Sequence, residues 1–355
     1  HVRVRRLPQR RRYQGRQQGD EGHKVEQQGQ VTEGLLGVQR GTDAGPGLTP
    51  SPPPRCQLLV EEPAHPEVTQ HRVAQPGVVA CSPTASALAL DGFPDNDRYF
   101  RTVPSDSLQA QAIAEAADQT GALQATIVHV DDAYGRSLAT SVAEAMAGGA
   151  ISVGDTIAFS GRDDDLGDEA QQLLASGSPV AIVLADDDDG TRFLETLGEF
   201  DTGGLATVVV NDAMRGTSSP QRIAGLDPEF RDRIVGLAPQ AASSDPATPF
   251  DPPGLFAANA YDCVNLIALA AVAAGSDAAV DIAGQIPLVS SSGSVCRTFA
   301  ACDEAIESGL VIDYNGPSGL TELARSGDPL RAVFDRFRYG PDGEDTLERT
   351  VLVGR

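Results

Sequence analysis

The sequence predicts an α/β fold whose strands form parallel sheets. Between residues 77 and 134, apolar runs of strand length alternate with segments in which apolar residues recur at helical spacing. Two of these runs, Val78–Cys81 and Ala125–Val130, end in polar turns. The 355 residues are also enough for two lobes with separate cores. Because parallel sheets bind ligands at the carboxyl ends of their strands, the polar turns are the first candidates for a site.

The elements of this stretch follow in a regular order. Tyr99–Val103 is a second extended run, and Ser105–Ser107 offers the N-cap chemistry that begins a helix. Apolar residues then recur at helical spacing up to Gly121, so we predict a helix there. The strand 125–130 follows, and after the turn 131–135 a further helix starts near residue 136.

The same alternation continues toward the C-terminus, and no internal repeat of 20 to 50 residues is present. The strands that we predict after the turn 131–135 are Ile151–Ile157, Val180–Ala185, Ala206–Val210 and Ile234–Leu237. The predicted helices are Ala139–Met146, Gly167–Ser176, Thr191–Phe200, Phe256–Ala274 and Asp277–Gln285.

The charge is acidic and unevenly distributed. Residues 1–75 hold 11 Lys and Arg against 8 Asp and Glu, a net +3, whereas residues 76–355 hold 16 against 42, a net −26. An acidic body argues against a nucleic-acid partner, since phosphates are neutralised by Lys and Arg. No run of 18 apolar residues is present, so no membrane span is expected.

Residues 1–75 differ in composition from the rest of the chain. They are rich in Arg, Gln, Gly and Pro, they have no apolar period, and they include no apolar core of a signal peptide. We predict that this segment is aberrant, for example an out-of-frame translation that re-enters frame near residues 74–77. The alternatives are a genuine disordered basic extension and an RNA-binding basic arm.

Three stretches of the sequence carry a family resemblance. "SPTASALAL" with "YFRTVPSDSLQAQAIAEAA", followed by "IVHVDDAYGRSLA", resembles periplasmic binding proteins of the leucine/isoleucine/valine type. The likeness covers about residues 77 to 343. It implies two doubly wound parallel-sheet lobes joined by hinge crossovers, the type 1 fold, without the first strands of lobe 1. Lobe 1 would be residues 76–103 and 239–313, and lobe 2 would be residues 104–238 and 314–355.

The resemblance also implies where a ligand would bind. Thr84, Ala85 and Ser86 match the family turn that holds the ligand's α-carboxylate, and Tyr134 matches an aromatic residue that covers the ligand. Asp212 matches an acidic position that faces the ligand's ammonium group, and Asp186 falls at a position near the pocket. Each has a purely structural alternative, namely helix capping for Thr84–Ser86 and Asp212, strand-end packing for Tyr134 and a solvated acidic turn for the run 186–189.

The cysteines fit an oxidising compartment. Cys296 and Cys302 lie six positions apart, where related binding proteins often carry a pair, so the resemblance implies a local disulfide. The alternative is two separate thiols. Cys81 and Cys263 lie in apolar runs, and we expect them to be inert core residues.

The sequence argues against an enzyme and against a metal site. The motifs of serine hydrolases, P-loop enzymes, zinc peptidases and dinucleotide-binding enzymes are missing, and His129 is the one histidine after residue 75. The run 186–189 lacks the spacing of a calcium loop, because Ala185 would stand at the first ligand position. We therefore expect no cofactor.

The function implied by the resemblance is extracytoplasmic binding of a small amino acid by a monomer. The protein would lie in the periplasm or at the cell surface and would pass its ligand to the membrane permease of an ABC importer. The alternatives are a sensing module of the same fold with a separate signalling partner, and a binder of an amide or urea.

Overall fold

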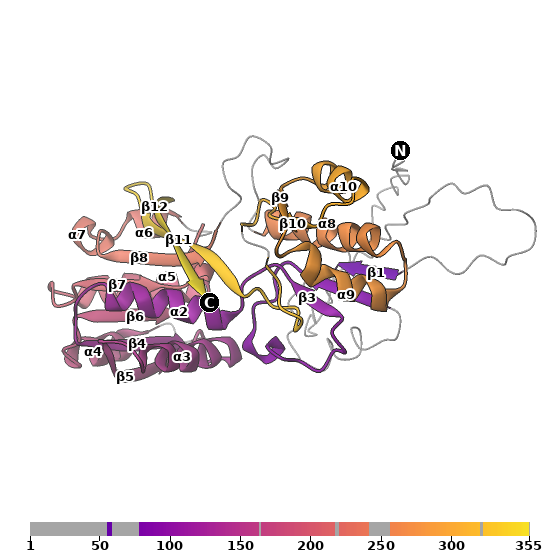
Figure 1. The fold of residues 1–355 in the computed structure, drawn as a ribbon. Helices are drawn as coiled ribbons and strands as arrows, with labels where there is room; N and C mark the ends of the chain where they lie inside the picture. The colour runs from indigo at the N-terminus through magenta and orange to yellow at the C-terminus, as the bar shows by residue number, and fades with distance from the viewer. Residues whose placement is uncertain are drawn as a thin grey trace, which may run out of the picture.

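The structure is a computed structural model that describes residues 55–58, 78–162, 165–216, 220–240, 256–319 and 322–354. Its elements form two groups that lie next to each other (Figure 1). The predictions for residues 1–54 and 59–77, and for Asp163 and Asp164, fall outside the described residues.

The larger group is a seven-stranded sheet in the order β12-β11-β8-β7-β6-β4-β5. Strands β4 to β8 pair in parallel, whereas β11 pairs antiparallel with both β8 and β12. Its strands are β4 (Gln124–Val130), β5 (Ser152–Phe159), β6 (Val180–Leu184), β7 (Thr207–Val210), β8 (Ile234–Pro239), β11 (Arg331–Tyr339) and β12 (Asp345–Gly354).

Alternate residues of each strand point to opposite faces of the sheet, and helices cover both faces. In β6, Ile182 packs in one core with α2 (Asp106–Asp118) and α3 (Ala133–Met146). Its neighbour Val183 packs in another core with α4 (Gly167–Ala175) and α5 (Asp187–Phe200). Every residue of β6 is buried, as expected for a strand covered on both sides. The short elements of this group are η2 (Asp212–Met214), α6 (Pro220–Ala224) and α7 (Pro228–Arg231).

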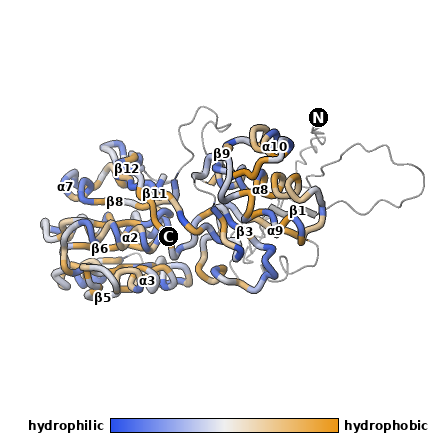
Figure 2. Tube along the Cα trace, in the orientation of Figure 1, coloured by the Kyte–Doolittle hydropathy of each residue, from blue (hydrophilic) through white to orange (hydrophobic). Residues whose placement is uncertain are grey.

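The smaller group has two short parallel sheets and a helical layer. One sheet has the order β1-β2-β3, and the other pairs β10 with β9. The longest helix, α8, is apolar over most of its length, which Figure 2 also shows. The elements are β1 (Arg55–Leu58), β2 (Val78–Ser82), η1 (Leu88–Leu90), β3 (Tyr99–Arg101), α8 (Ala257–Ala274), α9 (Ala279–Val289), β9 (Ser294–Cys296), α10 (Phe299–Glu307) and β10 (Ile312–Tyr314).

Helix α8 is long and apolar enough to cross a membrane, by length and composition alone. Here it packs against α9 and β2, and its buried side includes Cys263 and Leu266. It also buries the carboxylate of Asp262, which accepts hydrogen bonds from the Tyr314 hydroxyl (2.7 Å) and the Ser318 N–H (2.8 Å). In this fold α8 is therefore a core helix.

The chain passes between the two groups at three places. The first follows β3, the second follows β8 and the third leads into β11. Thr102 and Asn259 join the first crossover to α8 by two hydrogen bonds between side chain and backbone, of 2.8 and 2.9 Å. A small hollow lies where the crossovers meet, lined in part by Thr102, Gln240, Ser318 and Arg331.

The α/β architecture is confirmed, and two details of the sequence prediction are wrong. Residues 55–58, for which no strand was predicted, form strand β1 and pair in parallel with β2. That residues 1–75 are aberrant stays a prediction. A run of four residues is too short for a hydrophobic pattern to identify it as a strand. Strand β1 is recognised only by its pairing with β2. Helix α5 begins at Asp187 rather than at Thr191, because three acidic residues in the first turn are favoured by the helix dipole.

Candidate functional site

Tyr134 and Asp212 lie together at the carboxyl edge of the large sheet. Tyr134 is in the first turn of α3, directly after β4, and Asp212 begins the short helix η2 after β7. The Tyr134 hydroxyl donates to the carboxylate of Asp212 at 3.4 Å and accepts from the side-chain amide of Asn211 at 3.1 Å. Asn211 is fully buried, and its amide oxygen also accepts from the Ala185 N–H, so the end of β6 fixes it.

The environment of Asp212 is poorly solvated. Burial raises the pKa of its carboxyl group, against hydrogen bonds from Gln109, the backbone N–H of Ala213 and Tyr134, which favour the charged form. A carboxylate held in such a place gains strongly from a cationic partner. The alternative role for Asp212 is to cap η2. The cap position is instead held by the preceding residue, Asn211, whose side chain makes no capping hydrogen bond.

The turn Thr84–Ser86 is held by a buried arginine that the sequence reasoning treated only as part of a strand. Arg101 is fully buried, and its guanidinium donates to the backbone carbonyls of Ala85 (3.3 Å), Ser86 (2.9 Å) and Ala87 (3.2 Å). It also pairs with Asp91 and Asp328. The only local signal for this role is one cation inside the otherwise uncharged run 99–103.

This arrangement sets the direction of the backbone N–H groups. In a trans peptide the C=O and the N–H of the next residue point in opposite directions. Because the carbonyls of Ala85 and Ser86 point at Arg101, the N–H groups of Ser86 and Ala87 face away from it. The N–H groups of Thr84 and Ala85 are turned toward the Ser82 hydroxyl, at 3.4 and 3.0 Å. No side chain caps η1, the short helix that follows the turn.

Helix α2 connects this turn to the cluster at Asp212. The N–H of Asp106, the first residue of α2, donates to the carbonyl of Ser86 at 2.9 Å. One turn further along the helix, the side chain of Gln109 lies close enough to Asp212 to lower the pKa of its carboxyl group. Asp106 itself is buried, and the sequence reasoning gave it only a capping role.

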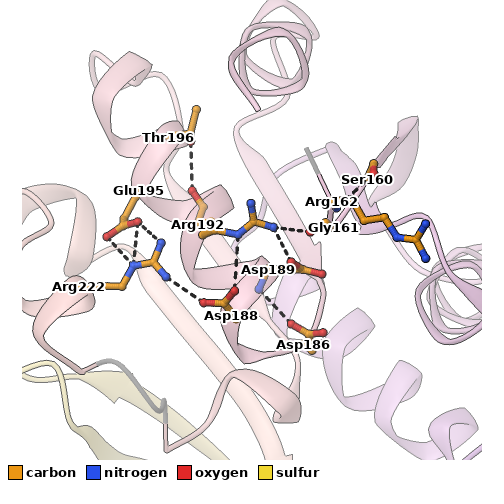
Figure 3. A network of polar contacts seen from close by, with 10 residues as sticks. All are labelled: Ser160, Gly161, Arg162, Asp186, Asp188, Asp189, Arg192, Glu195, Thr196 and Arg222. Atoms are coloured by element: carbon orange, nitrogen blue, oxygen red, sulfur yellow. Dashed lines mark hydrogen bonds and ion pairs between the residues drawn. The ribbon is translucent and has the colours of Figure 1, made fainter. Parts of the chain in front are cut away.

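Asp186 serves helix α5 and lies in a separate network (Figure 3). It is exposed, and its carboxylate accepts from the Asp189 N–H at 3.0 Å as the N-cap. Asp189 pairs with Arg192 at 2.6 Å, and Asp188 pairs with Arg222 at 3.0 Å. The predicted solvated acidic turn is therefore a helix N-terminus, and two of its carboxylates, those of Asp188 and Asp189, are paired with arginines.

Two disulfides lie in the part of the chain that the structure describes. Cys296 and Cys302 form the pair implied by the family resemblance, with Cα atoms 5.4 Å apart. Cys81 and Cys263 form a second disulfide between β2 and α8, with Cα atoms 5.6 Å apart, so the expectation of two inert core thiols is wrong. Both cysteines are buried in apolar surroundings as predicted, but 182 residues separate them and no local pattern could pair them.

Other candidate chemistry finds no support in the described part of the chain. No group of three or more His, Cys, Asp or Glu side chains there is placed to hold a metal ion. His129 is buried within β4, and its ring nitrogen contacts the carbonyl of Val130 at 2.9 Å.

A family model described as the receptor family ligand binding region matches residues 79–335. The chemotactic signal transduction system substrate-binding protein BasB of Halobacterium salinarum is 27% identical over 262 residues, which are 71% of this chain. The chain spans 62% of the length of BasB, less than two thirds.

Solved structures share the fold at low identity. The leucine-binding protein LivK of Thermotoga maritima has a TM-score of 0.59 at 18% identity, covering 80% of this chain and 75% of LivK. LivJ of Streptococcus pneumoniae, in complex with isoleucine, has a TM-score of 0.57 at 15% identity, covering 81% and 75%. A solute-binding protein of an ABC transporter from R. palustris, in complex with benzoate, has a TM-score of 0.59 at 13% identity, covering 81% and 74%. The matched model and the two-group α/β fold together show that this chain belongs to the receptor family ligand-binding region.

Proposed function

We propose that this protein captures a small free amino acid between the turn Thr84–Ser86 and the cluster of Tyr134 and Asp212. The observation that carries the proposal is the position of helix α2. Its first residue is hydrogen-bonded to Ser86, and Gln109, one turn later, lies close enough to Asp212 to lower the pKa of its carboxyl group. One helical turn rises about 5.4 Å, which is the scale of an amino-acid zwitterion.

Each side of the proposed site suits one charge of that zwitterion. The N–H groups of Ser86 and Ala87, turned away from Arg101, would receive the α-carboxylate, as backbone N–H groups at such turns bind anions. Asp212 would receive the ammonium group by a charge-assisted hydrogen bond, and Tyr134 would orient it. A ligand such as benzoate, which has no ammonium group, would leave the Asp212 carboxylate without its cation.

Closure of two lobes around the ligand would accompany binding. We propose lobes close to residues 76–103 with 239–313 and residues 104–238 with 314–355, which hinge at the three crossovers. The ligand favours the closed form only by contacts that it makes better there, and a ligand that touches both Ser86 and Asp212 makes such contacts. Asp186, as an exposed helix cap, would contribute less than Asp212.

Two partners are candidates for the closed form, and both place the protein outside the cytoplasm. One is the permease of an ABC importer, favoured by the likeness to the solute-binding protein of an ABC transporter from R. palustris and to LivJ, a transporter substrate-binding protein. The other is a signalling partner, favoured by the likeness to BasB, a component of a chemotactic signal transduction system. In a strain that lacks the gene, loss of uptake of the labelled ligand supports the first partner. Loss of taxis toward the ligand with normal uptake supports the second.

The binding proposal is tested by melting the full chain in the presence of each of the twenty amino acids, simple amides, urea and benzoate. A bound ligand raises the melting temperature in proportion to its affinity and concentration. We expect leucine, isoleucine or valine to raise it. A rise with benzoate, an amide or urea alone would contradict the proposal, as would no rise with any amino acid.

A further inference from the structure

The side chain of Gln109 is buried beside the proposed site and carries an amide oxygen without a partner. Gln109 is in the second turn of α2, and 3% of its surface is exposed. No donor in the described part of the chain reaches its Oε1 atom. Its Nε2 atom donates to the carbonyl of Leu237 in β8 at 3.5 Å, and its side chain lies close enough to Asp212 to lower the pKa of that carboxyl group.

The chemistry of these neighbours fixes the orientation of the amide. The Leu237 carbonyl and the Asp212 carboxylate are both acceptors, so the NH₂ end of Gln109 must face them. A rotation that exchanged the two ends would bring an acceptor against an acceptor. Oε1 is therefore left as a buried acceptor, and such a group is destabilising until a donor arrives.

We propose that Oε1 of Gln109 is a second acceptor for the ligand's ammonium group and that it makes the site selective for a primary amine. The inference rests on the proposed function, and it adds a residue and a selectivity to it. A primary ammonium has three N–H donors, so it can donate to the Asp212 carboxylate and to Gln109 Oε1 at the same time. A 2-hydroxy acid has one O–H donor in place of the ammonium. That donor bonds to Asp212, so no donor remains for Gln109 Oε1.

The experiment compares L-leucine with 2-hydroxy-4-methylpentanoic acid, which differs from it only in carrying a hydroxyl in place of the ammonium. Calorimetric titrations would be made on the full chain and on the variants Gln109→Met and Gln111→Met. Methionine has the length of glutamine and lacks its acceptor, and Gln111 is an exposed glutamine of the same helix. If another proteinogenic amino acid gives the largest melting shift, that amino acid and the hydroxy acid with its side chain are used.

We expect Gln109→Met to weaken leucine binding about tenfold, to leave the hydroxy acid within about twofold, and Gln111→Met to change neither. Equal losses of affinity for both ligands would indicate a purely structural role for Gln109 and would overturn the inference. Unchanged leucine affinity in Gln109→Met would overturn it as well. If Gln109→Met does not fold, Gln109→Asn, which keeps an amide, must discriminate leucine from the hydroxy acid better than Gln109→Leu, and equal discrimination would overturn the inference. A parent chain that binds no amino acid would overturn the proposed function itself, whatever the variants do.

Discussion

At the scale of single residues, the main feature is a set of polar groups whose partners come from distant parts of the chain. Tyr134, Asn211 and Asp212 are joined by hydrogen bonds across 77 and 78 positions of sequence. The turn chemistry of Tyr134 and Asp212 could be predicted, because each follows a strand with a clear apolar pattern. Arg101 and Gln109 could not, because their roles depend on burial, and burial of one polar residue leaves no periodic signal.

The charge of Asp212 is testable by a substitution of nearly equal size. Asp212→Asn removes the negative charge and keeps the shape, so a ligand ammonium loses a charge-assisted hydrogen bond. We expect amino-acid affinity to fall about 10- to 100-fold in calorimetry, which matches the roughly 1.5–3 kcal/mol of such a bond. Asp168→Asn, at an exposed position in α4, serves as the control and is expected to bind normally. Unchanged affinity in Asp212→Asn would remove Asp212 from the site.

At the scale of elements, the site depends on how α3 leaves β4. Gly135 follows Tyr134, and a Cβ atom at this position would overlap the carbonyl oxygen of Val130. The close approach of helix to strand therefore requires glycine, and it sets the position of the tyrosine ring. Strands and helices of this kind could be predicted from periodicity, whereas α5 was predicted too short because its first turn is acidic rather than apolar.

Gly135→Ala tests this close approach. Since α3 must shift to admit the methyl group, we expect a loss of about 1–3 kcal/mol in the free energy of unfolding and weaker amino-acid binding. Gly284→Ala is the matched control, because Gly284 is within α9 and a Cβ there meets open space. The control should be neutral or slightly stabilising, since alanine favours helix. Equal stability of the two variants would contradict the account.

The two disulfides close loops of very different length, and chain entropy predicts different contributions. The 182-residue separation of Cys81 and Cys263 gives about 5 kcal/mol, whereas the six-residue separation of Cys296 and Cys302 gives about 2 kcal/mol. We expect serine substitution of the first pair to lower the urea midpoint more than serine substitution of the second pair. The opposite order would show that the link between β2 and α8 contributes little.

At the scale of the whole molecule, two groups of elements meet at three crossovers, and a buried acid lies next to one of them. The α/β class and the alternation of elements followed from apolar patterning. The pairing of β1 with β2 and the disulfide between β2 and α8 did not, because both depend on contacts that only the folded chain makes. Burial raises the pKa of Asp262 to about 6, opposed by hydrogen bonds from Ser318 and Tyr314.

This pKa shift predicts how stability changes with pH. The unfolded chain releases the Asp262 proton near its ordinary pKa of 3.8, while the folded chain keeps it until about 6, so stability falls as pH rises between these values. The contribution is on the order of 3 kcal/mol. Asp262→Asn cannot titrate, so its urea midpoint should fall less between pH 4 and 6 than that of the parent chain. The exposed Asp277→Asn is the control, and parallel pH profiles for all three proteins would contradict the assignment.

The central claim is that one amino acid touches the turn Thr84–Ser86 and the cluster of Tyr134 and Asp212 at the same time. Hydrogen exchange of the full chain, with and without the amino acid that binds best, tests it directly. The account predicts slower exchange in peptides that cover residues 84–88, 133–137 and 211–214, and unchanged exchange in α4. Slower exchange in residues 84–88 alone, in the two cluster regions without residues 84–88, or in none of the three would contradict it.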